Sequence, residues 1–464
     1  MLISSWEIEI VMAEIPSEKE VNMNLSHHHH MKIRWDEFFK SSDNTLAREV
    51  TLVEKASLVG RVGQMLLSCG TGAWRVRDAM DTMARTLGIT CSADIGLVSI
   101  EYTCFAANNK SYSQTLTLPS TGVNMNKLNE MEKFVRQFQK GHGHWTLGQI
   151  NRRLDEIDQM KTKVPLWISG LSAGLACGGF IFLLGGGIPE IICAFVGAAI
   201  GAYIRGLMGK HKITMVAKIA SGVAMSCLGY FLTFLLLRTL LGIDYNHAYG
   251  YIGAMLFVIP GFPFITSGLD MSKLDMRSGL ERMAYAILII LIATMVGWGV
   301  AMLLRLKPGM IPPIKLNVLE LTGFRLIASF CGVFGFSIMF NSKLSMASIA
   351  AIIGSIANTS RLSLVDFGNM PPALAAFIGA LIAGLLASIV RNKVGYPRIS
   401  LTVPSIVIMV PGLYMYRAVY NFGINNINLG AYWIVAALMI VAALPMGLVA
   451  ARILTDKKWR HVNL

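Results

Sequence analysis

Phe257-Val258-Ile259-Pro260-Gly261 and Ile408-Met409-Val410-Pro411-Gly412 are two apolar stretches that each end in a Pro-Gly pair. Proline lacks an amide proton and glycine loosens the backbone, so such a pair ends or kinks a helix. Within lipid, a broken helix is tolerated where its backbone lines a cavity or is buried in protein. Matched breaks in two corresponding hydrophobic segments therefore indicate the binding site of a secondary transporter.

The composition is that of a membrane protein. Hydrophobic residues make up 54% of the 464 residues, charged residues make up 15%, and the mean hydropathy is +0.55. A soluble chain of this length normally carries more charge. A bilayer is therefore the first expected partner of the chain.

Hydrophobic segments near the length of a hydrocarbon core, about 20 residues of helix, begin after residue 164. The expected spans are residues 165–184, 188–208, 214–237, 248–267, 283–304, 321–340, 344–360, 371–391, 399–420 and 430–452. The two Pro-Gly pairs fall in the fourth and the ninth of these segments, and each is the fourth member of a set of five.

The two sets of five read as a repeat, because Pro260 and Pro411 are 151 residues apart and the same shift superimposes the spans. Five is an odd number, so the second set must be inverted relative to the first. The expected fold is an α-helical membrane protein of ten transmembrane helices in two five-helix inverted repeats, residues 164–310 and 311–464. The symmetry would bring the two breaks together near the middle of the bilayer.

The first 163 residues differ from the rest. Residues 1–44 read as a disordered leader, in which His27 to His30 suggest no function. Residues 45–163 read as a small cytoplasmic α+β domain of order α-α-β-β-α-α. Its helices are expected at residues 46–69, 74–87, 125–139 and 147–160, and its strands at 95–105 and 112–118.

Neither a metal nor a cofactor is expected. The seven cysteines include no C-x-x-C pair, and His142-Gly143-His144 lacks further ligands at an informative spacing, so it reads as a turn between helices. No phosphate-binding loop of the Walker type is present, which argues against ATP hydrolysis.

The positive charge indicates orientation. Residues 164–464 hold 22 Lys and Arg against 8 Asp and Glu, whereas residues 1–163 hold 19 of each. The excess lies mostly in one set of loops, so it predicts cytoplasmic N- and C-termini in the plasma membrane, not binding to nucleic acid.

Seven residues are candidates for the transport site. Broken helix ends offer amides to an anion and carbonyls to a cation, which suits the two charges of an amino acid. Arg417 could pair with a carboxylate or extend to the interface, and Asp270 could carry a coupling proton or pair with Lys273 at the interface. The substrate-binding candidates are Pro260, Gly261, Pro411, Gly412, Tyr414 and Arg417, and the proton-coupling candidate is Asp270.

Several motifs in order resemble the threonine/serine exporter family, from about residue 45 to the C-terminus. The first is the run from Gly63 to Gly88, with its Gly70-Thr71-Gly72 turn followed by Arg75-Val76. The others are Gly122-Val-Asn-Met-Asn-Lys-Leu128, Val258-Ile-Pro-Gly-Phe-Pro263, Ser278-Gly-Leu-Glu-Arg282, Gly335-Phe-Ser-Ile-Met-Phe-Asn341 and Val410-Pro-Gly-Leu-Tyr-Met-Tyr-Arg417. Some relatives are split into two proteins, and the loop Pro308-Gly309-Met310-Ile311-Pro312-Pro313 would be the seam of a fused form.

The resemblance implies a proton-coupled exporter of small hydrophilic metabolites, with threonine or serine as substrate. Thr266-Ser267-Gly268-Leu269-Asp270 departs from the family pattern by lacking its arginine, and Arg77 stands where an acidic residue is usual. Split relatives are associated with dicarboxylates, so succinate export is the alternative. A membrane-anchored enzyme, a channel or scaffold, and a homo-oligomer also stay open.

Overall fold

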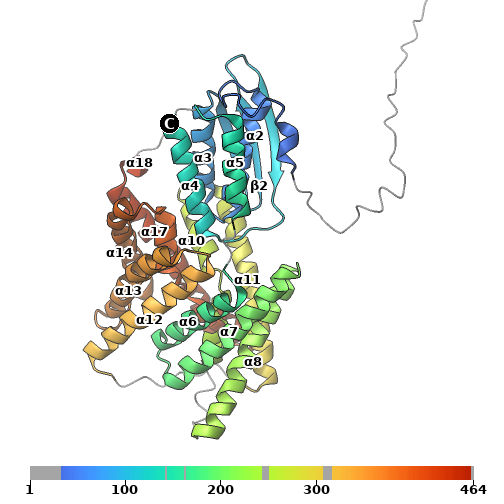
Figure 1. Ribbon diagram of the computed structural model, residues 1–464. Coiled ribbons are helices and arrows are strands. Elements are labelled where there is room, and N and C mark those ends of the chain that lie inside the picture. The colour runs from blue at the N-terminus through green and yellow to red at the C-terminus, as the bar shows by residue number, and fades with distance from the viewer. Residues whose placement is uncertain (1–32, 142–143, 161–163, 243–249, 307–315, 461–464) are drawn as a thin grey trace, which may run out of the picture.

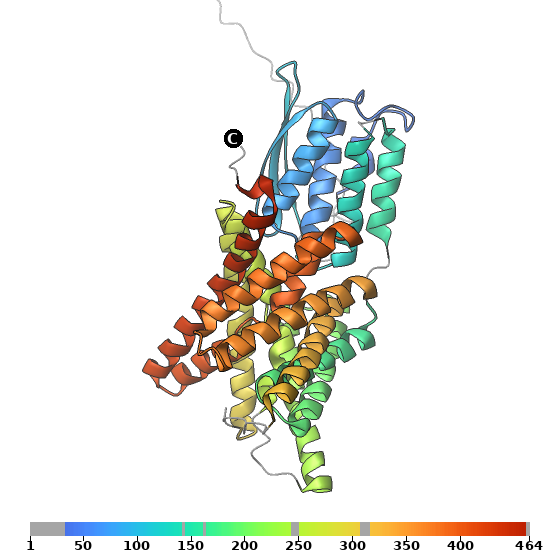
Figure 2. The ribbon, with the colours of Figure 1, turned by 90° about the vertical axis from the view of Figure 1, so that its left-hand side faces the viewer.

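A layer of helices and sheet lies against one end of a body of long helices in the computed structural model (Figure 1). The structure describes residues 33–141, 144–160, 164–242, 250–306 and 316–460. In the view turned by 90°, the two parts are stacked along the same direction (Figure 2). Residues 27–30, 142–143 and 308–313, to which the sequence assigns a leader, a turn and a seam, lie outside the described residues.

The described part of residues 33–160 forms what we call the N-terminal layer. Its sheet is antiparallel in the order β1-β2-β3, with Ile95 opposite Ile100 and Ile100 opposite Leu116. Its elements are η1 (Trp35–Phe38), α2 (Leu52–Ser68), α3 (Ala73–Thr86), β1 (Thr90–Ile95), β2 (Ser99–Phe105), β3 (Ser111–Thr117), α4 (Met125–Lys140) and α5 (Leu147–Gln159).

The expected order α-α-β-β-α-α omitted β1. The first apolar run was taken to begin at Ile95, which is instead the last residue of this extra strand. The other residues of β1 are exposed or half-buried, so the strand lacks an apolar run of its own. β1 is a strand because it pairs with β2, and such pairing leaves little pattern in the sequence of the strand itself.

Glu54 shows why α2 begins at Leu52 and not near residue 46. The Thr51 side chain accepts from the Glu54 amide and the Glu54 carboxylate accepts from the Thr51 amide, which is a capping box. The same carboxylate also accepts from the amides of Lys40 and Ser41, at 2.9 and 2.7 Å. Burial alone would raise the pKa of Glu54, but these hydrogen bonds outweigh it and lower the pKa from 4.5 to about 2.

Replacing Glu54 with glutamine should destabilise the N-terminal layer by about 2–3 kcal/mol at neutral pH. Because the folded-state pKa lies below the unfolded-state value, the stabilisation is complete above pH 4.5 and is lost as the pH falls toward 2. Thermal unfolding of the purified protein across this range should therefore show a smaller pH dependence in Glu54→Gln. Equal pH dependence in both proteins would contradict this assignment.

Among the described residues, eight helices of the helical body are long and apolar enough to cross a membrane. Two further pairs of shorter helices are bent at a break, and the number of spans rises to as many as ten if each pair counts as one span. The chain is thus a helical membrane protein. The eight are α6 (Leu166–Leu183), α7 (Ile188–Lys210), α8 (Met215–Leu241), α11 (Met276–Leu303), α12 (Val318–Met339), α13 (Leu344–Asp366), α14 (Pro372–Val394) and α17 (Ile427–Thr455).

The two bent pairs coincide with the Pro-Gly breaks. In the first, α9 (Tyr251–Met255) and η3 (Leu256–Val258) precede α10 (Gly261–Met271), with a bend of 50°. In the second, α15 (Arg398–Val407) precedes α16 (Gly412–Gly423), with a bend of 47°. The short helix α18 (Lys457–Arg460) follows α17.

The backbone is nearly the same at both breaks. Pro260 has φ −80° and ψ 58°, and Pro411 has φ −81° and ψ 55°. In each case the following glycine amide donates to the carbonyl before the proline, Gly261 to Ile259 at 2.8 Å and Gly412 to Val410 at 2.9 Å. These are inverse γ-turns, and they re-pair amides that a broken helix would otherwise leave open.

Helix ends extend further than the hydrophobic segments predicted. The fifth span was expected to begin at residue 283, but α11 begins at Met276, and so Arg277 and Arg282 are helical and not in a loop. Hydrophobicity alone could not show this, because helix continues past the apolar core wherever its charged side chains find partners.

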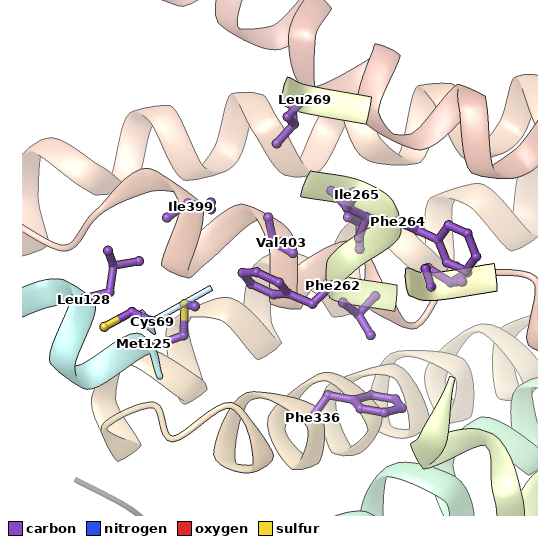
Figure 3. Packing of buried hydrophobic residues seen from close by; sticks show 14 of the residues in the cluster. Cys69, Met125, Leu128, Phe262, Phe264, Ile265, Leu269, Phe336, Ile399 and Val403 are labelled. Carbon is purple, nitrogen blue, oxygen red and sulfur yellow. The ribbon is translucent and has the colours of Figure 1, made fainter. Parts of the chain in front are cut away.

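The N-terminal layer and the helical body share one apolar cluster. Figure 3 shows Cys69 and Leu128 of the N-terminal layer near Ile399 of α15, with Phe262 of α10 beyond them. Within the body, glycines allow close packing; a Cβ on Gly201 would lie 2.5 Å from the Gly222 carbonyl oxygen. The N-terminal layer is therefore packed directly over the first break.

Candidate functional site

A cavity of about 220 Å³ lies at the first break. One wall is the backbone and side chains of residues 257–263, and the others come from α7, α11 and α12. Gly70, Leu97 and the segment 121–123 of the N-terminal layer complete its lining. The volume is below the roughly 300–1,000 Å³ of pockets for drug-sized ligands, which suits a small metabolite.

The charge of this cavity is positive. Arg205 and Arg282 line it together with Tyr285, and its described lining contains no acidic side chain. In the part of the chain that the structure describes, the Arg205 guanidinium has no acidic partner, and Tyr285 lines the same cavity. An arginine held in this way can offer its planar donors to a carboxylate.

Arg282 makes hydrogen bonds and an ion pair with several different segments. Its guanidinium donates to the carbonyls of Gly70 at 3.2 Å and Thr71 at 2.7 Å, and its Nε donates to Ser278 Oγ at 3.1 Å. The same Nε lies 3.2 Å from Asp270 Oδ2. These contacts join the glycine turn between α2 and α3 to α10 and α11.

Asp270 is fully buried at the end of α10, where Ser278 Oγ also donates to its Oδ2 at 3.0 Å. A Cβ on Gly72 would collide with Asp270 Oδ1, so the carboxylate lies directly against the start of α3. No side chain within the N-terminal layer caps that helix, and a carboxylate near an uncapped N-terminus is favourable. Of the two alternatives for Asp270, the one that paired it with Lys273 is wrong, since its ion-pair partner is Arg282.

More contacts hold the N-terminal layer to the segments around α10 and α11. Arg77 pairs with Asp275, Arg277 pairs with Asp94 and Glu101, and the Leu97 amide donates to Glu281. On the other side, the Met125 amide donates to the Phe340 carbonyl, and Asn341 donates to the Val123 carbonyl at 3.1 Å. Five of the six sequence motifs, all but Val410 to Arg417, thus meet around one cavity.

The two breaks contact one another reciprocally. A Cβ on Gly261 would meet Val407 and Val410, and a Cβ on Gly412 would meet Leu256 and Ile259. Each valine lies 151 residues after its counterpart, which is the separation of the two prolines. A cavity of about 10 Å³ lies between the breaks, and apolar side chains line it.

The structure brings two of the six substrate-binding candidates into the 220 Å³ cavity, Pro260 and Gly261. Pro411 precedes α16, and Gly412 lines the small cavity between the breaks. Arg417 and Tyr414 do not line the larger cavity, and both lie against Trp433. The guanidinium carbon of Arg417 is 4.8 Å from the centre of the Trp433 ring, and the ring centre of Tyr414 is 4.9 Å from it. In this conformation a cavity large enough for a small solute lies at the first break.

Sequence reasoning missed Arg205, Arg282 and Tyr285 as site residues. The two arginines were counted among charges that set orientation, because they stand near segment ends. A signal was present in the Ser278-to-Arg282 motif, but its role depends on the Gly70 and Thr71 carbonyls, which are 212 and 211 residues away.

Two family models match the chain. One, described as "Putative threonine/serine exporter", matches residues 57–305, and a second, described as "Threonine/Serine exporter, ThrE", matches residues 325–454. Together they cover the cavity, both breaks and most of the described chain. No solved structure matches it.

Curated relatives carry two kinds of name. The "Probable succinate transporter subunit YjjP" is 26% identical in Klebsiella aerogenes and 25% in Escherichia coli, in both cases over 51% of this chain and 88% of the relative. The "Probable threonine/serine exporter" of Mycobacterium tuberculosis is 21% identical over 79% of this chain and 69% of the relative.

Proposed function

The chain belongs to the threonine/serine exporter family, in its fused form, and we propose that it exports threonine or serine from the cell in exchange for protons. Membership of a transporter family makes it a multi-pass membrane exporter of small metabolites and not an enzyme. The substrate and the coupling ion are the parts that we propose.

The observation that carries the proposal is Arg205 in the cavity at the first break. A carboxylate of the solute would pair with Arg205, and the carbonyls at the broken end of η3 would receive an ammonium group. The carboxylate and the ammonium group of an amino acid would then both bind at the first break. The apolar contact between the two breaks would close the cavity toward the second break.

Succinate, a dicarboxylate, is the second candidate. Two arginines line the cavity and no described lining residue is acidic, which favours a solute with more than one negative charge. Two relatives named as succinate transporter subunits match this chain over 51% of its length. Arg282 is already paired with Asp270, so Arg205 is the cation with donors to spare.

We propose ten spans in two inverted five-helix repeats as the frame for alternating access. The equal turns at Pro260 and Pro411 and the reciprocal contacts of Gly261 and Gly412 support a two-fold relation between the breaks. The proposed orientation in the plasma membrane puts both termini and the N-terminal layer in the cytoplasm, which the excess of Lys and Arg at that end supports.

Asp270 is the proposed proton carrier. Intramembrane carboxylates paired with arginine are typical of proton relays. Neutralising Asp270 would weaken its hold on Arg282 and on the start of α3, and could thereby release the N-terminal layer from the cavity mouth.

Efflux measurements test the function. Cells with and without the chain would be loaded with a threonine-containing dipeptide or with succinate, and the release of each solute would be measured. We expect expression to accelerate threonine release severalfold and a protonophore to stop it. Faster succinate release alone would favour the second candidate. No change for either solute would contradict export, and release that persists with protonophore would indicate a channel.

A further inference from the structure

A second cleft, with a cavity of about 310 Å³, lies where the N-terminal layer meets the ends of α14, α15 and α17. We call it the cationic cleft. It shares no lining residue with the cavity at the first break. Its charged lining residues are Arg75, Arg136, Lys273, Arg391, Arg398 and Arg452 on the positive side, and Asp78, Glu132 and Asp456 on the negative side.

Arg398 is buried there with part of its hydrogen-bonding capacity unused. It is 5% exposed, and its guanidinium donates to Thr455 Oγ1 and to the Gly384 carbonyl, both at 3.0 Å. Its Nε is buried and has no partner among the described residues. A buried cationic donor without a partner is costly, so the site is incomplete as it stands.

Arg452 is 4% exposed and lies between two indole rings. Its guanidinium carbon is 4.9 Å from the centre of Trp74 and 4.5 Å from that of Trp459. Lys273 Nζ lies over Trp459 as well, at 4.0 Å. These aromatic faces position the cations, but they leave the guanidinium edge of Arg452 without an acidic hydrogen-bond partner in the described chain.

The acidic residues of the cleft do not neutralise it. Glu132 is shared by Arg75 and by Arg136, the latter at 2.9 Å. Arg452 shares the cleft with the cations Arg75, Arg391 and Arg398, and Asp456 is the one acidic residue of the described chain that acts favourably on it. Several like charges held together in a partly enclosed space need a counter-ion, and the excess is larger than one carboxylate could balance.

The positive-inside rule explains why Lys and Arg gather at this end of the helices, but not why they converge. Cations that serve only orientation extend outward into water or headgroups. Lys393, on the same helix end as Arg391, is exposed in this way and does not line the cleft. The six cations of the cleft instead come from six different segments and line one cavity.

We propose that the cationic cleft binds a multiply charged anion bearing phosphate groups, supplied either by a soluble phosphorylated metabolite or by the headgroup of an anionic lipid. Arginine donors match phosphate oxygens in pairs, and several phosphate charges would balance Lys273, Arg391, Arg398 and Arg452. The bound anion joins α3 and α4 to α14, α15 and α17. It thus holds the N-terminal layer in place over the transport cavity.

Binding is tested on the purified full-length protein in lipid nanodiscs, without a transport assay. In phosphatidylcholine nanodiscs the probe is pyrophosphate, with sulfate at equal ionic strength as the reference, and binding is followed by thermal shift. In a second arm, phosphatidic acid replaces part of the lipid. Stabilisation by pyrophosphate supports a soluble ligand, and stabilisation by phosphatidic acid alone supports a lipid headgroup.

The double variant Lys273→Gln/Arg391→Gln should bind the stabilising anion roughly tenfold more weakly, since two half-buried cations are removed and the buried arginines stay. Lys393→Gln is the matched control and should bind as the unaltered protein does. The proposal is overturned if neither probe stabilises the protein beyond sulfate, or if the double variant and the control respond equally.

Discussion

Replacing Arg205 with glutamine is expected to reduce efflux of threonine, or of succinate if that is the substrate, by roughly a hundredfold, because a desolvated charge pair with the solute is worth about 2–5 kcal/mol. The variant should still fold. Arg205 has no acidic partner to leave behind among the described residues, and its removal lowers the repulsion in a cavity that also holds Arg282. The measurement is initial efflux from loaded cells, normalised to the amount of membrane-inserted protein.

Lys210→Gln is the matched control, since it removes an exposed cation from the same helix. Arg417→Ala provides the comparison with the second break, where Arg417 lies against Trp433. If Arg417→Ala abolishes efflux and Arg205→Gln does not, the substrate carboxylate binds at the second break, and the assignment of the cavity to substrate is wrong.

Replacing Asp270 with asparagine is expected to remove the dependence of efflux on the proton gradient, and replacing Arg282 with glutamine is expected to prevent stable folding. The pair is almost fully buried, with side-chain exposures of 0% for Asp270 and 3% for Arg282. Removing one partner of such a pair costs about 3–5 kcal/mol because the other charge is left unpaired. Asparagine can still accept from Ser278, whereas glutamine cannot reproduce the four contacts of Arg282.

The double variant Asp270→Asn/Arg282→Gln should recover part of the stability lost in Arg282→Gln, because no isolated buried carboxylate remains. Asp275→Asn is the control, because it breaks a different ion pair between the N-terminal layer and the start of α11. In that pair Asp275 is the partner of Arg77. Efflux from proteoliposomes would be measured with and without an imposed pH gradient. Asp270→Asn efflux that keeps the full response to the gradient would exclude Asp270 as the proton carrier.

The sequence allowed the helical body to be predicted almost element by element. Hydrophobic segments and helices coincide because a helix satisfies its own backbone, so its position is a local property. The Pro-Gly breaks were recognisable for the same reason, since a missing amide at Pro260 or Pro411 acts on its own helix. The strand β1 was missed because pairing with a neighbour, and not its own pattern, makes it a strand.

The candidate site could be predicted only in part. Pro260 and Gly261 stand out along the chain as a break, and Asp270 stands out as a carboxylate close to the end of the fourth hydrophobic segment. Arg205 does not, because an arginine near a segment end looks the same whether it extends to the interface or turns into a cavity.

By itself, the sequence determined that this is a membrane transporter with two matched helix breaks, since composition, segment length and proline are properties of the chain. Only the tertiary structure decided that the open cavity lies at the first break, that Asp270 is paired with Arg282, and that the glycine turn of the N-terminal layer covers both. The covering of the cavity by the glycine turn depends on contacts between residues more than 200 positions apart, as between Arg282 and Gly70, and the Asp270–Arg282 pair joins two different helices. Such contacts form through tertiary packing, and they leave no recognisable pattern in a short stretch of sequence.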